Sequence, residues 1–450
     1  MNTPRFIPVR STRTRRRLGV PTAVALLALT VAACDSAEVA PPPVAEFESA
    51  VVFNYRLQDP DGYVNFVGVY EDVPTELDLS TMIEAGGDGS SVISLGDEIF
   101  VYDGVSTYTK FTVDRTDLSL TADDRVIDLS RAGVTGEIGN PVFVGDNEVY
   151  LIDSANGVIV EIDPEAMEIV ETINFPPTVA EGWTPFTGSG ASFSTFHHYV
   201  TAENLVIAVV ASFDTADWTQ PYATTLMVFD PATNQVTFNS DDRVPSSYSQ
   251  LIEMPDGSFF LDPYWSTSIA ETYGNHDSAE IPSGNVMLRI LPDGTFDPNF
   301  EIDLGETAGF DYVRDVPFVL GDEAVVNHYP AGTAAPDDWI GIFSIPTVAT
   351  AVNLQTGATR PFTALDGYTA WGPLGKVGNT EYFFAYPPDS ITDEDNFEVL
   401  RQNGLTSYTT VIETPGGDVR WLAQLWGPEP AAATATVQTA EAAPRVVVAR

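Results

Sequence analysis

Short runs of apolar residues, each ended by a polar turn, follow one another along most of the chain. Between about Val51 and Trp426 these runs are rich in Val, Ile, Phe, Thr and Tyr, and Gly, Asp, Asn and Pro separate them. The region shows no long amphipathic helix pattern. Short β-forming runs between turn residues are typical of an all-β protein.

Two units recur within this region. The first is an apolar run, a tight acidic turn and a second apolar run, with copies at 92–101, 142–151, 198–206, 251–260, 317–326 and 374–383. The second unit is a strand that ends near a turn, and its copies recur every 48 to 67 residues at Asp114, Asp163, Asp230, Leu291, Asn353 and Arg401. Four strands per roughly 45 to 60 residues form one blade of a β-propeller.

Six such blades cover about 88–416, so one strand remains after them and three before them. The last strand is 418–426, and its expected partners are 51–56, 63–69 and 77–80. Together they would form a seventh blade that closes the ring and removes its exposed edges. The sequence therefore predicts a seven-bladed β-propeller with four-stranded blades, closed by the N- and C-terminal strands. Six or eight blades, a jelly roll or two β-sandwiches are the alternatives.

The N-terminus has the pattern of an export signal. Six arginines and no acidic residue precede Leu18–Ala33, which is apolar apart from two threonines. This run is shorter than the ~20 residues of a membrane-spanning helix. It ends in Val-Ala-Ala-Cys34, which resembles the bacterial lipobox; a buried cysteine after an ordinary signal peptide is the alternative. We predict a lipoprotein signal peptide (1–33), an acylated Cys34 with a Pro-rich tether (34–50), the propeller (51–426) and a disordered tail (427–450).

This organisation predicts an exported lipoprotein of the cell envelope, attached to the lipid bilayer through Cys34. The outer membrane or cell surface is favoured over the inner membrane. Since Cys34 is the only cysteine, an intramolecular disulfide and a multi-cysteine metal site are excluded.

Acidic residues dominate the charge. The chain has 64 Asp and Glu against 20 Lys and Arg, and cleavage before Cys34 would leave only 14 basic residues. This balance argues against nucleic-acid binding, because phosphate contacts need clustered cations. With Lys110 and Lys376 as the only lysines, the composition suggests adaptation to high salt. A locally acidic ligand surface, such as a Ca²⁺-binding one, is the alternative.

The candidate ligand site lies on long loops. The connections between second and third strands are short in the first two of these six blades but long at 212–223, 262–285, 328–346 and 386–396. They emerge on the same face as the connections between blades, and function concentrates in such loops. Their aromatic side chains could line a pocket for a flat small-molecule ligand, although each could instead pack between blades. The expected ligand-binding residues are Trp183, Tyr264, Trp265, His276, Tyr312, Arg314, His328, Tyr329 and Trp371.

No motif predicts catalysis. The chain lacks a G-x-S-x-G elbow, a phosphate-binding Gly loop and H-E-x-x-H. His276 and His328 have carboxylates nearby in principle, which suits a divalent cation. They form no compact His/Asp motif, so we predict no metal site, no cofactor and no enzymatic activity.

Several segments resemble a known family. The lipobox at Cys34, the strand-turn-strand of 51–70, and the blade 92–114 followed by 140–163 are similar to surface-anchored seven-bladed propeller lipoproteins encoded with siderophore uptake systems, including myxochelin-type systems. The resemblance implies a non-enzymatic protein that captures a ferric siderophore and passes it to an outer-membrane receptor. We expect a monomer.

The charge restricts this hypothesis. A ferric catecholate is anionic, and Arg314 and Arg243 are the few cations near the expected face. Either Arg314 lies at the pocket centre, or the ligand is neutral or cationic. A protein-interaction scaffold and a metal-dependent lactonase-like hydrolase are the alternative functions. Burial of the aromatic residues between blades and a closed channel mouth would favour the scaffold.

Overall fold

The structure, a computed structural model, describes most of the chain between Glu46 and Gly427. Within that range it leaves out 60–61, 88–89, 135–137, 139–140, 145–147, 176–190, 215–222, 245–249, 255, 264–284, 321–322, 334–344, 346, 366–367, 369, 388–395, 404–406 and 416. Cys34, the signal segment and residues 428–450 lie outside the described residues. Among those described, no helix combines the length and the apolar character needed to span a membrane.

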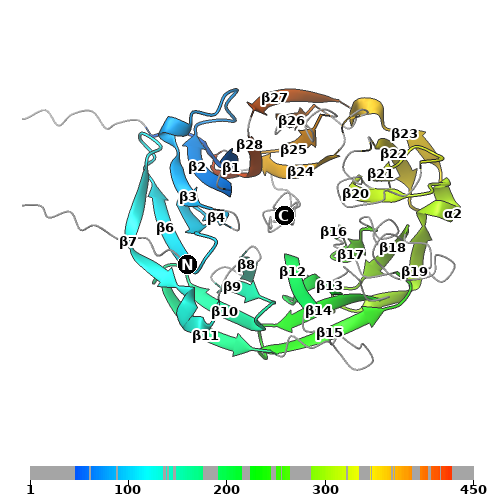
Figure 1. Ribbon diagram of the computed structural model, residues 1–450, viewed down its shortest axis with the longest axis horizontal. Coiled ribbons are helices and arrows are strands. Elements are labelled where there is room, and N and C mark those ends of the chain that lie inside the picture. The colour runs from blue at the N-terminus through cyan, green and yellow to red at the C-terminus, as the bar shows by residue number, and fades with distance from the viewer. Residues whose placement is uncertain are drawn as a thin grey trace, which may run out of the picture. The chain divides into compact units, whose positions relative to one another are not determined.

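Seven four-stranded antiparallel sheets are arranged in a ring (Figure 1). Blade 1 contains β28 (Gly417–Trp426), β1 (Ala50–Asp59), β2 (Gly62–Tyr70) and β3 (Ile83–Gly86). Blade 2 contains β4 (Ser91–Leu95), β5 (Glu98–Tyr102), β6 (Thr107–Val113) and β7 (Leu120–Asp128). Blade 3 contains β8 (Val142–Val144), β9 (Glu148–Asp153), β10 (Val158–Asp163) and β11 (Glu168–Asn174). Blade 4 contains β12 (Ala191–Val200), β13 (Val206–Asp214), β14 (Thr224–Asp230) and β15 (Gln235–Asp241).

The remaining three blades repeat the same strand order. Blade 5 contains β16 (Leu251–Glu253), β17 (Phe259–Leu261), β18 (Val286–Ile290) and β19 (Phe296–Asp303). Blade 6 contains β20 (Val313–Leu320), β21 (Glu323–His328), β22 (Val348–Asn353) and β23 (Thr359–Pro361). Blade 7 contains β24 (Ala370–Val377), β25 (Thr380–Tyr386), β26 (Asn396–Gln402) and β27 (Tyr408–Pro415). The seven-bladed propeller predicted from the repeats is confirmed, and both repeat units fall on the predicted strands.

Each pair of neighbouring blades shares its own hydrophobic core. Strand β1 shows how the sequence achieves this. Val51 and Phe53 face the core shared with blade 7, whereas Ala50 and Val52 face the core shared with blade 2. Successive side chains of a strand point to opposite faces, so a blade buried on both faces reads as a continuous apolar run.

The two ends of the propeller meet in blade 1. Strand β28 pairs antiparallel with β1, and the register places Arg56 opposite Asp418. Arg56 Nε donates to Asp418 Oδ1 at 3.0 Å, and its Nη2 donates to Oδ2 at 2.8 Å. The Arg56 guanidinium also lies 4.1 Å from the Tyr63 ring centroid. This bidentate pair joins residues far apart in the sequence and reinforces ring closure.

The outermost strand of blade 1, β3, differs from the prediction. The segment 77–80 was expected to form it, but Leu79–Thr81 is a short 3₁₀ helix, η1, and β3 follows at Ile83–Gly86. Asp78 caps η1, because its Oδ1 accepts from the Ser80 backbone N–H at 3.0 Å. An Asp that satisfies the free N–H groups of a turn competes with strand pairing at this position.

Short helices occupy some connections between blades. They are η2 (Leu129–Ala132) after blade 2, α2 (Leu304–Ala308) after blade 5 and η3 (Thr363–Leu365) after blade 6. Asp128 caps the start of η2 and Asp303 that of α2, and a glycine with positive φ ends each of these two. These turns carry the chain from an outermost strand back to the next innermost strand.

Candidate functional site

A cavity of about 610 Å³ lies at the centre of the ring. All seven innermost strands line it, namely β28, β4, β8, β12, β16, β20 and β24 (Figure 1). Its volume falls within the range of small-molecule sites, about 300–1,000 Å³. Because one strand from every blade lines the cavity, the cavity forms only when the ring is closed.

Three prolines mark the strand edges that face the cavity. Pro141, Pro317 and Pro373 all line it and lie just before β8, within β20 and within β24. An innermost strand has a hydrogen-bonded neighbour on one side only, so a residue without an N–H is tolerated on its free edge. The prolines therefore leave fewer unpaired backbone donors at the cavity wall.

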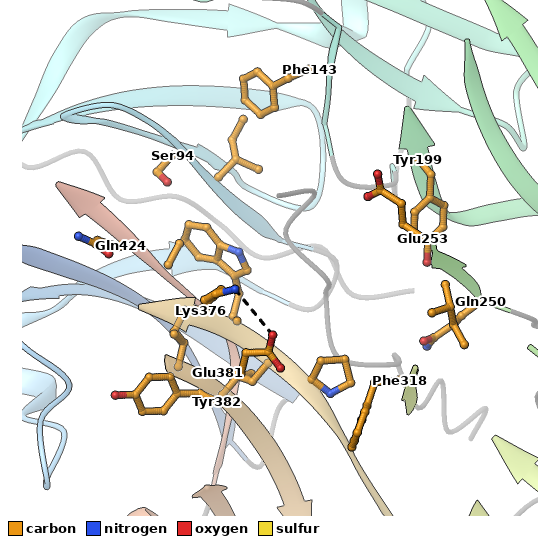
Figure 2. Close-up of a pocket in the computed structure, with 18 of the residues that line it drawn as sticks. Ser94, Phe143, Tyr199, Gln250, Glu253, Phe318, Lys376, Glu381, Tyr382 and Gln424 are labelled. Atoms are coloured by element: carbon orange, nitrogen blue, oxygen red, sulfur yellow. Dashed lines mark ion pairs between the residues drawn. The ribbon is translucent and has the colours of Figure 1, made fainter. Parts of the chain in front are cut away.

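The wall combines apolar surface with a few polar groups. Aromatic rings come from Phe143, Tyr199, Phe318, Tyr382 and Trp421. The charged groups are Lys376, Glu381 and Glu253. Lys376 Nζ lies 3.8 Å from Glu381 Oε1, and Figure 2 shows this pair on a different side of the opening from Glu253 and Tyr199. Apolar walls with a few placed polar groups are the usual composition of a site for an organic ligand.

Desolvation shapes the chemistry of Glu253. Partial burial raises the pKa of its carboxyl above the ordinary value, and no described residue forms an ion pair with it. Nearby, the Tyr199 hydroxyl accepts from the Leu251 backbone N–H at 3.3 Å, which fixes the tyrosine against β16. One wall of the cavity thus carries an aromatic ring and an uncompensated carboxyl group.

The cavity lies on the other side of the ring from the predicted site. Its lining includes the ends of innermost strands, such as Glu253, Val319 and Gln424, and the β4–β5 turn at Gly96. The sequence placed the site among the connections between second and third strands, which emerge on the opposite face. The lengths of those connections had favoured the opposite face as the ligand site. The cavity that the structure describes is instead lined mainly by strands.

Four of the predicted ligand-binding residues lie outside the described residues: Trp183, Tyr264, Trp265 and His276. Trp371 is only 2% exposed and belongs to the core shared by blades 6 and 7. Its ring packs near Phe318 and Phe362, with centroid distances of 5.7 Å and 6.2 Å. Its position matches the packing alternative given for each aromatic residue.

The other four come together at one end of blade 6. Tyr312 and Arg314 lie at the start of β20, and His328 and Tyr329 lie at the end of β21. The Tyr329 backbone N–H donates to the Tyr312 carbonyl at 3.1 Å. Arg314 is 2% exposed and Tyr329 is 1% exposed. None of the five predicted residues that the structure describes belongs to the lining of the central cavity.

His328 in this group is neutral at pH 7. Its Nδ1–H donates to the Tyr329 carbonyl at 3.0 Å, so Nε2 accepts from the Thr350 hydroxyl at 2.9 Å. Its ring stacks on Phe310 with a centroid distance of 3.8 Å. Desolvation lowers the pKa of His328, which keeps the imidazole uncharged.

Two buried carboxyl groups, Asp262 and Asp315, lie near β20. Asp262 Oδ1 accepts from the Val316 backbone N–H at 2.9 Å, and Asp315 Oδ1 accepts from Asn327 Nδ2 at 2.6 Å. Arg314 Nε lies 3.8 Å from Asp315 Oδ2. Burial raises the pKa of Asp315 to about 6, and burial together with the Asp315 charge raises the pKa of Asp262 well above its usual range.

These shifts predict a pH dependence of stability. Folding raises the pKa of both carboxyl groups above the unfolded value of 3.8, so the folded state favours their protonated form. The stabilisation by this form is complete below pH 3.8 and is lost as the pH rises through the folded pKa. We expect Asp262→Asn to keep the Val316 hydrogen bond and to gain stability relative to the unmodified chain between pH 5 and pH 8. Urea unfolding at several pH values measures this difference.

Asp123→Asn is the control with the opposite sign. The hydrogen bond from Arg125 lowers the pKa of Asp123 to about 2, so its carboxylate stabilises the fold above pH 3.8. The same stability change for Asp262→Asn at every pH would contradict the prediction.

Most cations of the described residues already have a carboxylate partner. Every described lysine and arginine except Arg401 forms an ion pair with a carboxylate. Arg401 Nε instead donates to Asn403 Oδ1 at 3.3 Å. Arg314, which the sequence offered as a pocket cation, is buried beside Asp315. The cavity itself holds two carboxyl groups and one ammonium group.

Among the described residues, no group of three or more His, Cys, Asp or Glu side chains is arranged to hold a metal ion. His328 uses both ring nitrogens in protein hydrogen bonds. It is therefore not oriented as a metal ligand.

Sequence analysis did not identify the residues that line the cavity. Within an innermost strand, a residue that faces the cavity has the same sequence pattern as a residue buried in the core. Tyr199, Glu253 and Phe318 lie in ordinary strand runs. One signal was present: Pro141, Pro317 and Pro373 fall in or beside predicted first strands, where a proline indicates a free edge. Side chains near such an edge face the channel.

Comparisons with known proteins return structural likeness alone. No family model and no curated protein matches the chain. Similar solved structures include apo AztD from Citrobacter koseri (11% identity, 84% of this chain and 97% of that chain, TM-score 0.39) and TolB from Acinetobacter baumannii (12%, 84% and 82%, 0.33). Virginiamycin B lyase from Staphylococcus aureus is similar at 10% identity, covering 74% and 91%, with a TM-score of 0.39. At these values they carry no argument about ligand or activity.

Proposed function

We propose that this chain is a non-catalytic binding protein whose central cavity takes a small organic ligand. The observation that carries the proposal is the cavity of about 610 Å³, to which every blade contributes. Its aromatic and aliphatic walls supply contact area, and its few polar groups would orient a ligand. A rigid closed ring keeps these groups in place before the ligand arrives, which reduces the entropic cost of binding.

A ferric siderophore is the ligand class that the family resemblance implies. The charged groups of the cavity then favour siderophores of one charge over those of another. A ferric tris-catecholate is trianionic, and all described cations except Arg401 are already paired with carboxylates. A ferric hydroxamate, which is neutral or cationic, suits the cavity better. Iron uptake through an outer-membrane receptor remains part of this proposal.

Calorimetric titration of the full chain with a ferric hydroxamate and a ferric catecholate tests the proposal. We expect micromolar binding of the hydroxamate and much weaker binding of the catecholate. Ser94→Trp, which fills the cavity, should weaken binding at least about tenfold because it removes ligand contact area. Ser119→Trp, at an exposed turn, is the control. Equal binding by both variants would place the ligand elsewhere, and no binding of either complex would oppose the siderophore assignment.

Membrane attachment through Cys34 is a second part of the proposal. It is supported by the lipobox and by the Pro-rich segment that precedes β1. We expect Cys34→Ser to move the protein from the membrane fraction to the soluble fraction without changing its unfolding midpoint. Fractionation and mass measurement of the N-terminal peptide check this result; membrane retention of the variant without an acyl chain would contradict it.

A protein-interaction scaffold is the second candidate function. Burial of Trp371 and Tyr329 favours it, because these aromatic residues are used for packing. The open central cavity favours the small-ligand proposal instead. Co-purification of a stoichiometric protein partner that Ser94→Trp leaves bound would support the scaffold.

A further inference from the structure

We propose that the cavity recognises an organic cation through Glu253 and the neighbouring Tyr199 ring. This inference rests on the proposed function and names the ligand charge at the same site. It concerns a primary or quaternary ammonium group carried on an apolar body, whatever else the ligand contains.

The two residues come from adjacent blades and meet at one wall of the cavity. Tyr199 is near the end of β12, and Glu253 ends β16. Figure 2 shows both at the same side of the opening. Tyr199 is 7% exposed, and its ring packs edge-on to Phe259 with centroids 5.8 Å apart. The packing and the Leu251 hydrogen bond hold this ring in one orientation.

A carboxylate next to an aromatic face is a recognition element for ammonium groups. The carboxylate supplies charge attraction, and the negative face of the ring supplies a cation–π contact. Phe143, Phe318 and Trp421 provide further aromatic surface around the same volume. An apolar ligand body can therefore fill the cavity while its cation is placed beside Glu253.

The other charged groups of the cavity do not offer the same site. Glu381 is paired with Lys376 at 3.8 Å, so that pair has little net charge. Glu253 forms no ion pair with a described residue, and its desolvation raises its pKa. A bound cation would remove this penalty, whereas a bound anion would increase it.

Matched probes separate charge recognition from cavity binding. Tryptamine, tryptophol and indole-3-propionate share an indole body and carry a cation, a neutral hydroxyl and an anion. We expect the full chain to bind tryptamine about three- to tenfold more tightly than tryptophol, as calorimetry at pH 7.5 measures, because Glu253 is partly exposed to solvent. Indole-3-propionate should bind most weakly. Raising the salt concentration to 1 M should shrink the difference.

Glu253→Gln should bring tryptamine to the affinity of tryptophol and leave tryptophol unchanged. Glu168→Gln, on the outermost strand β11, makes the same charge change away from the cavity and should alter neither affinity. Tryptophol binding as tightly as tryptamine, or equal losses in both variants, would overturn the charge inference while leaving the cavity proposal intact. Failure of all three probes to bind would overturn the inference, and the hydroxamate titration would then decide the cavity proposal separately.

Discussion

Asp418→Ala is expected to lower the free energy of unfolding by about 3–5 kcal/mol, the cost of breaking a buried ion pair from one side. Asp418 receives both hydrogen bonds of Arg56, and their side chains are 9% and 11% exposed. Arg420 Nη1 also lies 3.4 Å from Asp418 Oδ2. Removing the carboxylate takes away an ion-pair partner of both Arg56 and Arg420 at the pairing of β1 with β28, where the ring closes.

Urea unfolding followed by tryptophan fluorescence measures this effect. Asp123→Ala is the matched control, because it breaks the Arg125–Asp123 pair, in which the arginine side chain is 56% exposed. Exposed pairs contribute little to stability, so a much smaller loss is expected for this control. The double substitution Arg56→Met with Asp418→Leu should recover part of the loss, since apolar residues can replace the Arg56–Asp418 pair, while Arg420 still loses its contact with Asp418. Similar losses for Asp418→Ala and Asp123→Ala would show that the pair does not hold the ring closed.

Gly375→Ala is expected to cost about 3 kcal/mol, because a Cβ at this position would overlap the carbonyl oxygen of Leu422. Gly375 lies on β24 and Leu422 on β28, so innermost strands of blades 7 and 1 approach each other here by backbone contact. Backbone atoms cannot rotate away as a side chain can. The two strands must separate, which disrupts the core around Leu374 and Leu422.

Gly87→Ala is the control for the glycine substitution. A Cβ at Gly87 would meet the Tyr63 carbonyl oxygen at 3.7 Å, which is ordinary contact. We expect a change within about 0.5 kcal/mol. Both residues 375 and 422 also line the cavity, so Gly375→Ala should weaken binding of any cavity ligand as well. Unfolding midpoints that agree between the two variants would contradict the close approach of β24 to β28.

The candidate site was less predictable than the fold. Arg314, His328 and Tyr329 were chosen from loop positions, and the structure brings them to one end of blade 6, where Arg314 and Tyr329 are buried with Asp315. Whether Arg314 could reach a ligand depended on its nearest carboxylate, and the sequence cannot measure that distance. Glu253 and Tyr199, which line the cavity, belong to strands that differ little in pattern from buried ones.

Blade 1, which closes the ring, shows the same limit of sequence analysis for a single strand. The need for three N-terminal partners of 418–426 followed from counting strands, and the structure confirms the count. The choice of 77–80 as the third partner was wrong, because Asp78 caps a helical turn there. Local hydrogen bonding by one side chain decided which of two nearby segments joined the sheet.

The sequence by itself determined the β class, the four-stranded repeat and the ring closure, because period and turn residues are local properties that repeat in every blade. It also determined the acidic balance, from which we predict that nucleic acid is not a partner. Only the tertiary structure decided that all described arginines except Arg401 are paired with carboxylates and that seven innermost strands enclose a cavity. Ion pairing and enclosure depend on residues from different blades, and their distances are fixed only when the ring closes.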